Sequence, residues 1–291
     1  SGSRGLGDVY KRQGVNPFKF GMIGSTDNHT ALPTSREENN FSKASFVEPS
    51  AERAFHPLIK GQTPELSLLE ADVGASGLAA VWARENTRES IWDAMARKET
   101  YATSGTRIRV RVFGGWDFEA DEVHRPDFAR EGYARGVPMG GDLSDSPDGV
   151  APKFLVRALR DPDGANLDRV QVIKGWLDSN GDTHEKIWDV ACGGSRDIVN
   201  GACDGDVGNT VDIADASYTN TIGSAALAAH WSDPEFDPAQ KAFYYVRVLE
   251  IPTPRWTTYD AVKNGLPLLD DVPATVQERA WTSPIWYAPG G

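Results

Sequence analysis

The chain has 291 residues, of which 40% are hydrophobic and 25% are charged, so it can bury one large core or two ordinary ones. Its formal net charge of -12 repels phosphate backbones, and no stripe of Lys and Arg offsets that charge locally. We therefore expect no binding to nucleic acid. No run approaches the roughly 18 consecutive apolar residues of a membrane-spanning helix, so we also expect no membrane span.

The first thirteen residues show no helical or strand period and have no evident place in a core. Within them, the string "SRGLGDVYKRQ" is what a transposase-type sequencing adaptor encodes when it is translated in one reading frame. We therefore interpret residues 1–13 as adaptor readthrough and not as native sequence. On that interpretation the natural protein is cut at or near residue 14, and any signal peptide or metal ligand upstream is missing.

The segment after the adaptor-like string begins with the compact apolar run "NPFKFGMIG" (16–24), which predicts a strand. The stretch from 28 to about 62 is rich in Pro, Ser, Asn and Glu, and we expect a long loop there with one short helix over 51–59. A buried strand is expected over 77–84.

A helix is expected next, in "ENTRESIWDAMARKET". Asn86 and Glu89 have the spacing of a capping box, and Ile91, Ala94 and Met95 fall on one face. These signals are structural, and we assign them no chemistry.

From residue 106 onward the pattern changes to that of strands, because Ile108, Val110 and Val112 alternate with arginines. Further strand-like runs follow, separated by turn-rich segments such as "DSNGD". They cover residues 152–160, 168–178, 185–191, 243–251 and 281–288. Such a succession predicts an antiparallel β-sandwich over residues 106–291.

Asp27 and His29 form the sharpest local motif, in "STDNHT" directly after the first strand-like run. Residues i and i+2 of an extended segment point to the same side, so a carboxylate oxygen and an imidazole nitrogen can converge on one cation. Gly21 and Gly24 would let the backbone approach a ligand closely. The pair is also consistent with ordinary hydrogen bonds in a loop. The other histidines, which show no metal-binding spacing, are His56, His124, His184 and His230.

Cys192 and Cys203 flank a short polar segment. In an exported protein they could close a disulfide, whereas in a cytosolic protein they would remain thiols. A disulfide would favour a periplasmic or extracellular location over a cytoplasmic one. Just before them, "DSNGDTHE" (178–185) resembles a calcium loop but lacks the full ligand series, so we predict a hairpin turn.

Six blocks of the sequence resemble the C-terminal half of the DUF3604 family, which is related to the PHP (polymerase and histidinol phosphatase) metal-dependent hydrolases. The blocks are "NPFKFGMIGSTDNHTALPTSREENNFSKA", "GLAAVWARENTRESIWDAMARKETYATSGTRIRVRVFGGW", "GVPMGGDL", "VQVIKGW", "FYYVRVLEIPTPRW" and "QERAWTSPIWYAP". The resemblance implies an α/β plus all-β chain: residues 14–105 would be the C-terminal part of a distorted PHP-like β/α barrel, and residues 106–291 an antiparallel β-sandwich-like domain.

The same resemblance implies that Asp27 and His29 are the last metal ligands of the parent enzyme, which would hold divalent zinc, manganese or iron. That enzyme would cleave a phosphoester, or a related ester or amide, in a small-molecule substrate by metal-activated water. No His-x-His is present to supply the first ligands, so we expect the fragment to be inactive, with its own metal binding weak or absent. The alternative is a carbohydrate- or partner-binding β-sandwich attached to a degenerate barrel, since the nine tryptophans could provide a sugar-stacking surface.

Overall fold

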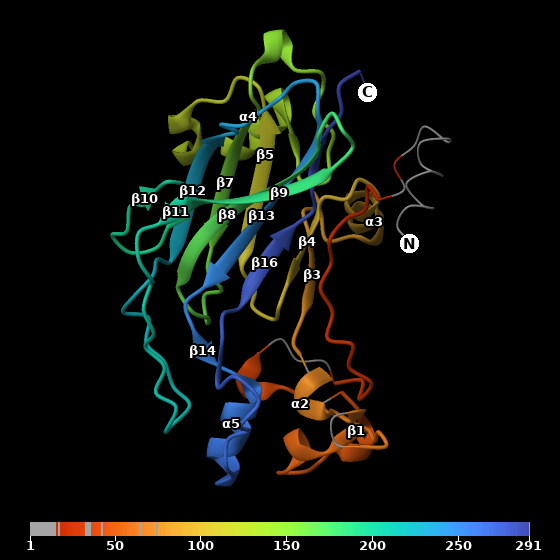
Figure 1. Ribbon diagram of the computed structural model, residues 1–291, viewed down its shortest axis with the longest axis vertical. Coiled ribbons are helices and arrows are strands. Elements are labelled where there is room, and N and C mark those ends of the chain that lie inside the picture. Colours follow the sequence, from red (N-terminus) through yellow and green to blue (C-terminus); the bar gives the residue numbers. More distant parts are fainter. Residues whose placement is uncertain are drawn as a thin grey trace.

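The structure, a computed structural model, describes residues 16, 18–32, 36–41, 43–63, 66–73 and 75–290. The adaptor-like residues 1–13 lie outside this part. The molecule is elongated, with two large sheets in its upper half and a smaller lobe of short helices and strands below them (Figure 1).

A seven-stranded sheet forms one layer of the upper half, in the order β3-β4-β16-β13-β8-β9, with β17 also pairing with β13. All of its strand pairs are antiparallel. Its strands are β3 (Leu78–Val81), β4 (Thr100–Thr103), β8 (Leu167–Leu177), β9 (Thr183–Cys192), β13 (Lys241–Glu250), β16 (Arg279–Thr282) and β17 (Ile285–Tyr287).

A four-stranded antiparallel sheet, in the order β12-β7-β5-β6, forms the other layer. Its strands are β5 (Arg109–Gly115), β6 (Gly136–Pro138), β7 (Lys153–Leu159) and β12 (Ala226–Ser232). Val110 and Val112 of β5 belong to the same buried cluster as Val246 and Val248 of β13, so the two sheets share one core. The alternation predicted over β5 is confirmed, because its valines are buried while Arg109 is exposed.

The expected end of a β/α barrel is not observed, since none of the sheets formed by the described residues closes on itself. A barrel requires β3 and β4 to be parallel, with the helix between them as a crossover. Instead the two strands pair antiparallel, with Ala79 opposite Ala102. Trp82 N–H also donates to the Glu99 carbonyl at 3.0 Å, so the antiparallel pairing extends to the residues that flank the segment with the helix. The helix α3 (Arg88–Ala96) is therefore an insertion in a hairpin.

The cap of α3 also differs from the prediction. Thr87, and not Asn86, is the N-cap, and its side chain accepts a hydrogen bond from Ser90 N–H. Ala94 is buried as expected, whereas Met95 is 52% exposed. The apolar face of the helix is therefore narrower than its spacing predicts.

The strands predicted after residue 150 are present with small shifts at their ends, and "DSNGD" is the turn of the β8–β9 hairpin. The run 281–288 is divided into β16 and β17 at Ser283 and Pro284, because proline has no N–H to donate to a ladder. Additional short elements, most of them on the four-stranded layer or near the disulfide, are η5 (Ala120–His124), α4 (Phe128–Arg135), η6 (Pro147–Gly149), β10 (Ile198–Val199) and β11 (Ala202–Cys203).

The lower lobe combines residues from two distant parts of the chain. Trp256 is buried there with Ala54 and Ala71, and Arg53 forms ion pairs with Asp260 at 2.6 Å and Glu48 at 2.7 Å. Its elements are η1 (Glu37–Asn39), η2 (Ser45–Val47), η3 (Arg53–Phe55), β1 (Pro57–Ile59), β2 (Leu68–Leu69), α2 (Glu70–Val73), β14 (Thr253–Pro254), α5 (Trp256–Asn264) and β15 (Thr275–Val276).

The helix predicted over 51–59 was too long, because only the three residues of η3 are helical there. No helix in the described ranges is long and apolar enough to span a membrane.

Candidate metal centre

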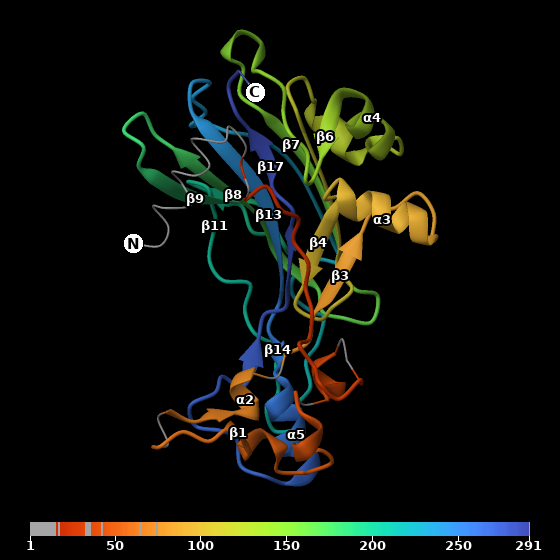
Figure 2. The same cartoon turned by 90° about the vertical axis from the view of Figure 1, so that its right-hand side faces the viewer.

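Residues 19–26 run beside β3 towards the lower lobe (Figure 2) but form no strand, so the strand predicted over 16–24 is not observed in the described residues. Gly24 N–H donates to the Leu78 carbonyl oxygen at 3.2 Å, and a Cβ at Gly24 would lie 2.6 Å from that oxygen. A Cβ at Gly21 would lie 2.7 Å from Thr100 Oγ1 of β4, and a Cβ at Gly77 would lie 2.4 Å from the Ser25 carbonyl oxygen of the segment. These glycines thus let the segment approach the sheet, and not a ligand as the sequence suggested.

Asp27 and His29 are close together at the end of this stretch. His29 Nε2 lies 3.3 Å from Asp27 Oδ1, and both side chains are exposed. The backbone at Asp27 is left-handed, with φ of 50°, a conformation that Asp tolerates better than most residues. The two side chains therefore meet across a bend and not at the extended strand end that the i, i+2 spacing predicted.

Lys43 is a third member of the group, and no pattern in the sequence links it to the pair. Its ammonium group forms an ion pair with Asp27 Oδ2, which leaves Oδ1 beside His29. The Lys43 hydrogen bond, followed by that of His29, lowers the pKa of Asp27 below its ordinary value. Asp27 is thus a carboxylate at neutral pH, as a metal ligand must be.

The backbone around the pair is fixed from the lower lobe. His29 N–H donates to the Lys43 carbonyl at 2.7 Å, and Lys43 N–H donates to Glu70 Oε2 at 2.9 Å. Glu70 itself is fully buried in α2. Asn28 donates from its side chain to the Phe41 carbonyl at 2.8 Å. The loop that contains the pair is therefore anchored by hydrogen bonds to residues 41 and 43.

The donors fit a divalent cation in type and spacing. Two ligands about 2.1 Å from a tetrahedral zinc ion lie about 3.4 Å apart, close to the separation of Asp27 Oδ1 and His29 Nε2. In number they are insufficient: among the described residues, no three His, Cys, Asp or Glu side chains could hold a metal ion together. The remaining histidines do not complete the group.

Closeness of an Asp and a His is not specific by itself. Asp178 Oδ2 and His184 Nε2 are 2.9 Å apart on the β8–β9 hairpin, where the turn geometry accounts for the contact. This second pair provides a matched control for any experiment on Asp27 and His29.

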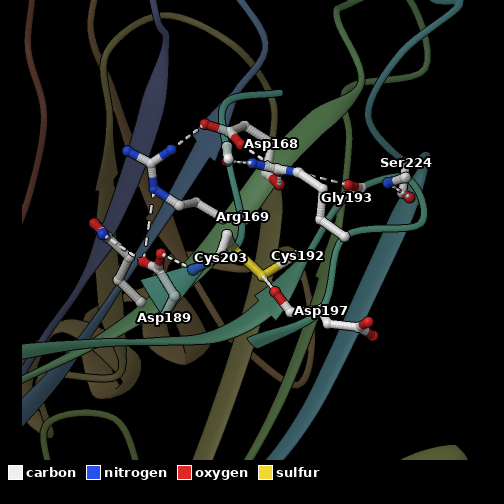
Figure 3. The surroundings of a disulfide bond; sticks show 12 residues. Asp168, Arg169, Asp189, Cys192, Gly193, Asp197, Cys203 and Ser224 are labelled. Atoms are coloured by element: carbon white, nitrogen blue, oxygen red, sulfur yellow. Dashed lines mark hydrogen bonds and ion pairs between the residues drawn. A yellow bond between two sulfur atoms is a disulfide. The ribbon is translucent and has the colours of Figure 1, made fainter. Parts of the chain in front are cut away.

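The two cysteines lie elsewhere, on the β9 side of the sandwich. Cys192 and Cys203 form a disulfide with a Cα–Cα distance of 5.8 Å (Figure 3). Arg196 in the enclosed loop donates to the buried Asp168 carboxylate at 2.6 Å, and Cys203 N–H donates to Asp189 at 2.8 Å. The disulfide therefore closes a loop that is also held by polar contacts, and it has no contact with the metal-ligand candidates in this structure.

A second polar feature is an acidic cavity of about 240 Å³ between the lower lobe and the seven-stranded sheet. Glu37, Glu250 and Glu278 line it. Burial, and next the charge of Glu37, raise the pKa of Glu278 to about 8. Burial, and next the charge of Glu278, also raise the pKa of Glu250 well above its ordinary value. Glu278 therefore keeps its proton at neutral pH.

The comparison with known protein families gives one result. A family model described as "Protein of unknown function (DUF3604)" matches residues 3–289. The chain belongs to the DUF3604 family. No curated protein and no solved structure matches this DUF3604 chain. The family assignment made from the sequence blocks is thus confirmed, while the relationship to PHP enzymes and the adaptor origin of residues 1–13 stay predictions.

Proposed function

We propose that this DUF3604 chain is part of a metal-dependent hydrolase, in which Asp27 and His29 are two ligands of a divalent cation. The observation that supports the proposal best is the 3.3 Å convergence of Asp27 Oδ1 and His29 Nε2, with Lys43 paired to the other carboxylate oxygen of Asp27. The donor set suits zinc, manganese or iron(II).

Each residue has a separate role in this proposal. A bound cation would lower the pKa of a water molecule and neutralise charge developing on a phosphoryl or carbonyl oxygen. Lys43 would fix the orientation of Asp27, and the hydrogen bonds of the 27–30 loop to residues 41–43 would keep both donors aimed at one point. The substrate would be a small molecule with a phosphoester, ester or amide bond.

The remaining ligands would come from parts of the protein that the structure does not describe. This arrangement would relate the protein to PHP enzymes, although none of the described sheets closes into a barrel. The chain alone should therefore not hydrolyse p-nitrophenyl phosphate or p-nitrophenyl acetate. Hydrolysis that is abolished by a chelator would show that the site is already complete in this chain.

The binding role of the pair can be tested by titrating the purified chain with Mn²⁺ and recording the imidazole signals by NMR. We expect the His29 signal to broaden at lower Mn²⁺ than those of the other four histidines, because Asp27 adds a second donor, whereas the carboxylate beside His184 also accepts two backbone hydrogen bonds of its turn. The Asp27→Asn variant should lose this preference, whereas Asp178→Asn should leave it unchanged. Broadening of His184 before His29 would refute the assignment.

A further inference from the structure

A groove of about 940 Å³ lies at the ends of β8, β9, β13 and β17. Its central strand residue, Phe243, alternates with Ala242 and Tyr244, which belong to the core between the two sheets. Phe243 therefore projects from the opposite, outer face of the seven-stranded sheet. Among the residues of the outer face that line the groove are Gly175, Leu177, Thr183, Glu185, Phe243 and Trp286.

Two aromatic side chains form a platform on this face. Phe243 is in register with Gly175 on β8 and with Trp286 on β17. A Cβ at Gly175 would lie 2.3 Å from the Phe243 ring, so the ring packs directly on the strand backbone. The Phe243 and Trp286 ring centroids are 5.2 Å apart, with the planes tilted by 46°. Both side chains are only partly buried, so an apolar ligand surface can still contact them.

Polar side chains border the platform. Glu185 is in register with Gly175 and is exposed, so its carboxylate lies on the wall of the groove. Lys19 approaches from the N-terminal segment, with its ammonium 5.9 Å from the Trp286 ring centroid and paired with the Asp142 carboxylate. Lys241 lies at the start of β13. The border thus carries charges of both signs, together with the hydroxyl group of Thr183.

We propose that this groove binds a neutral oligosaccharide. The apolar C–H face of a pyranose ring would stack on Phe243 and Trp286, while its hydroxyl groups would bond to the polar border. Because Lys19, Lys241 and Glu185 carry charges of both signs, the groove should prefer a neutral ligand to a strongly charged one. Because the groove is partly open to solvent, it suits a segment of a chain more than a single enclosed sugar. This site is separate from Asp27 and His29 and goes beyond the proposed hydrolase.

The proposal can be tested with the whole chain by calorimetric titration with cellohexaose, xylohexaose, laminarihexaose and chitohexaose. We expect saturable binding of at least one of them, weakened about tenfold or more by Phe243→Ala and by Trp286→Ala. Gly175→Ala should weaken binding similarly, since its methyl group displaces the Phe243 ring without removing it. Circular dichroism would verify that each variant is folded.

Trp92→Ala is the matched control, because Trp92 is 66% exposed on α3 and does not line the groove. It should bind as the unmodified chain does, and so should the Asp27→Asn variant, which separates this test from that of the metal site. The proposal is wrong if none of the four hexasaccharides binds at millimolar concentration. Equal binding by the unmodified chain and the three groove variants would also refute it.

Discussion

Removal of the Cys192–Cys203 disulfide should destabilise the protein, and the structure allows the loss to be calculated. The bond joins residues that are 11 positions apart, so it closes a loop of about 12 residues. In the chain-entropy model, opening a loop of this length increases the freedom of the unfolded chain by about 3 kcal/mol at 25 °C. The Arg196–Asp168 and Cys203–Asp189 contacts hold the loop in the folded state without the bond. The effect should therefore arise mainly in the unfolded state.

Urea unfolding of the unmodified chain and of the Cys192→Ala/Cys203→Ala double variant would measure this loss. We expect the free energy of unfolding to fall by about 3 kcal/mol, with the sheet content of the folded state unchanged. A reducing agent should lower the stability of the unmodified chain and leave that of the double variant unaltered. A difference below about 0.5 kcal/mol would refute the entropic argument. Equal sensitivity of both proteins to the reductant would show that the agent acts elsewhere.

Two further predictions concern burial and close packing. Because the pKa of Glu278 is raised to about 8, the folded state retains a proton that the unfolded state releases above about pH 4.5, so stability should fall as pH rises from 4.5 to 8. The fall in the free energy of unfolding that Glu278 causes is about 5 kcal/mol at most, and Glu278→Gln should remove it. Identical pH profiles of urea unfolding in the unmodified chain and the variant would contradict this prediction. Gly24→Val should detach the N-terminal segment from β3 because its Cβ would meet the Leu78 carbonyl oxygen at 2.6 Å. Limited proteolysis should then cleave within 18–32 faster than in the unmodified chain, and an unchanged cleavage rate would argue against this packing.

Local patterns in the sequence were enough to predict most strands of the two large antiparallel sheets. The alternation of Val110 and Val112 with arginines reports directly which face of a strand is buried, and the structure confirms it. The cap of α3 was misplaced by one residue, because Asn86 and Thr87 can both accept a backbone hydrogen bond and only packing selects one of them. The barrel was expected from the family resemblance. The alternation of side chains along a strand is the same whether its neighbour is parallel or antiparallel, so the sequence could not show that β3 and β4 pair antiparallel.

The sites depend on contacts between residues far apart in the chain, which is why the sequence revealed them only in part. Asp27 and His29 were found because they are neighbours, but nothing in the sequence connects them with Lys43. The platform of the groove was also missed, since Gly175 and Phe243 face each other only after β8 and β13 pair. Gly175, a glycine inside the apolar strand β8, was the one signal in the sequence that another group packs closely on this strand.

The metal content of the longer protein to which we propose this chain belongs tests the central claim most directly. Elemental analysis should find stoichiometric zinc, manganese or iron in the unmodified protein and a loss of most of it in His29→Ala. His184→Ala, which disrupts the other Asp–His pair, should retain the metal. A metal-free unmodified protein, or equal metal content in all three proteins, would contradict the proposal that Asp27 and His29 are ligands.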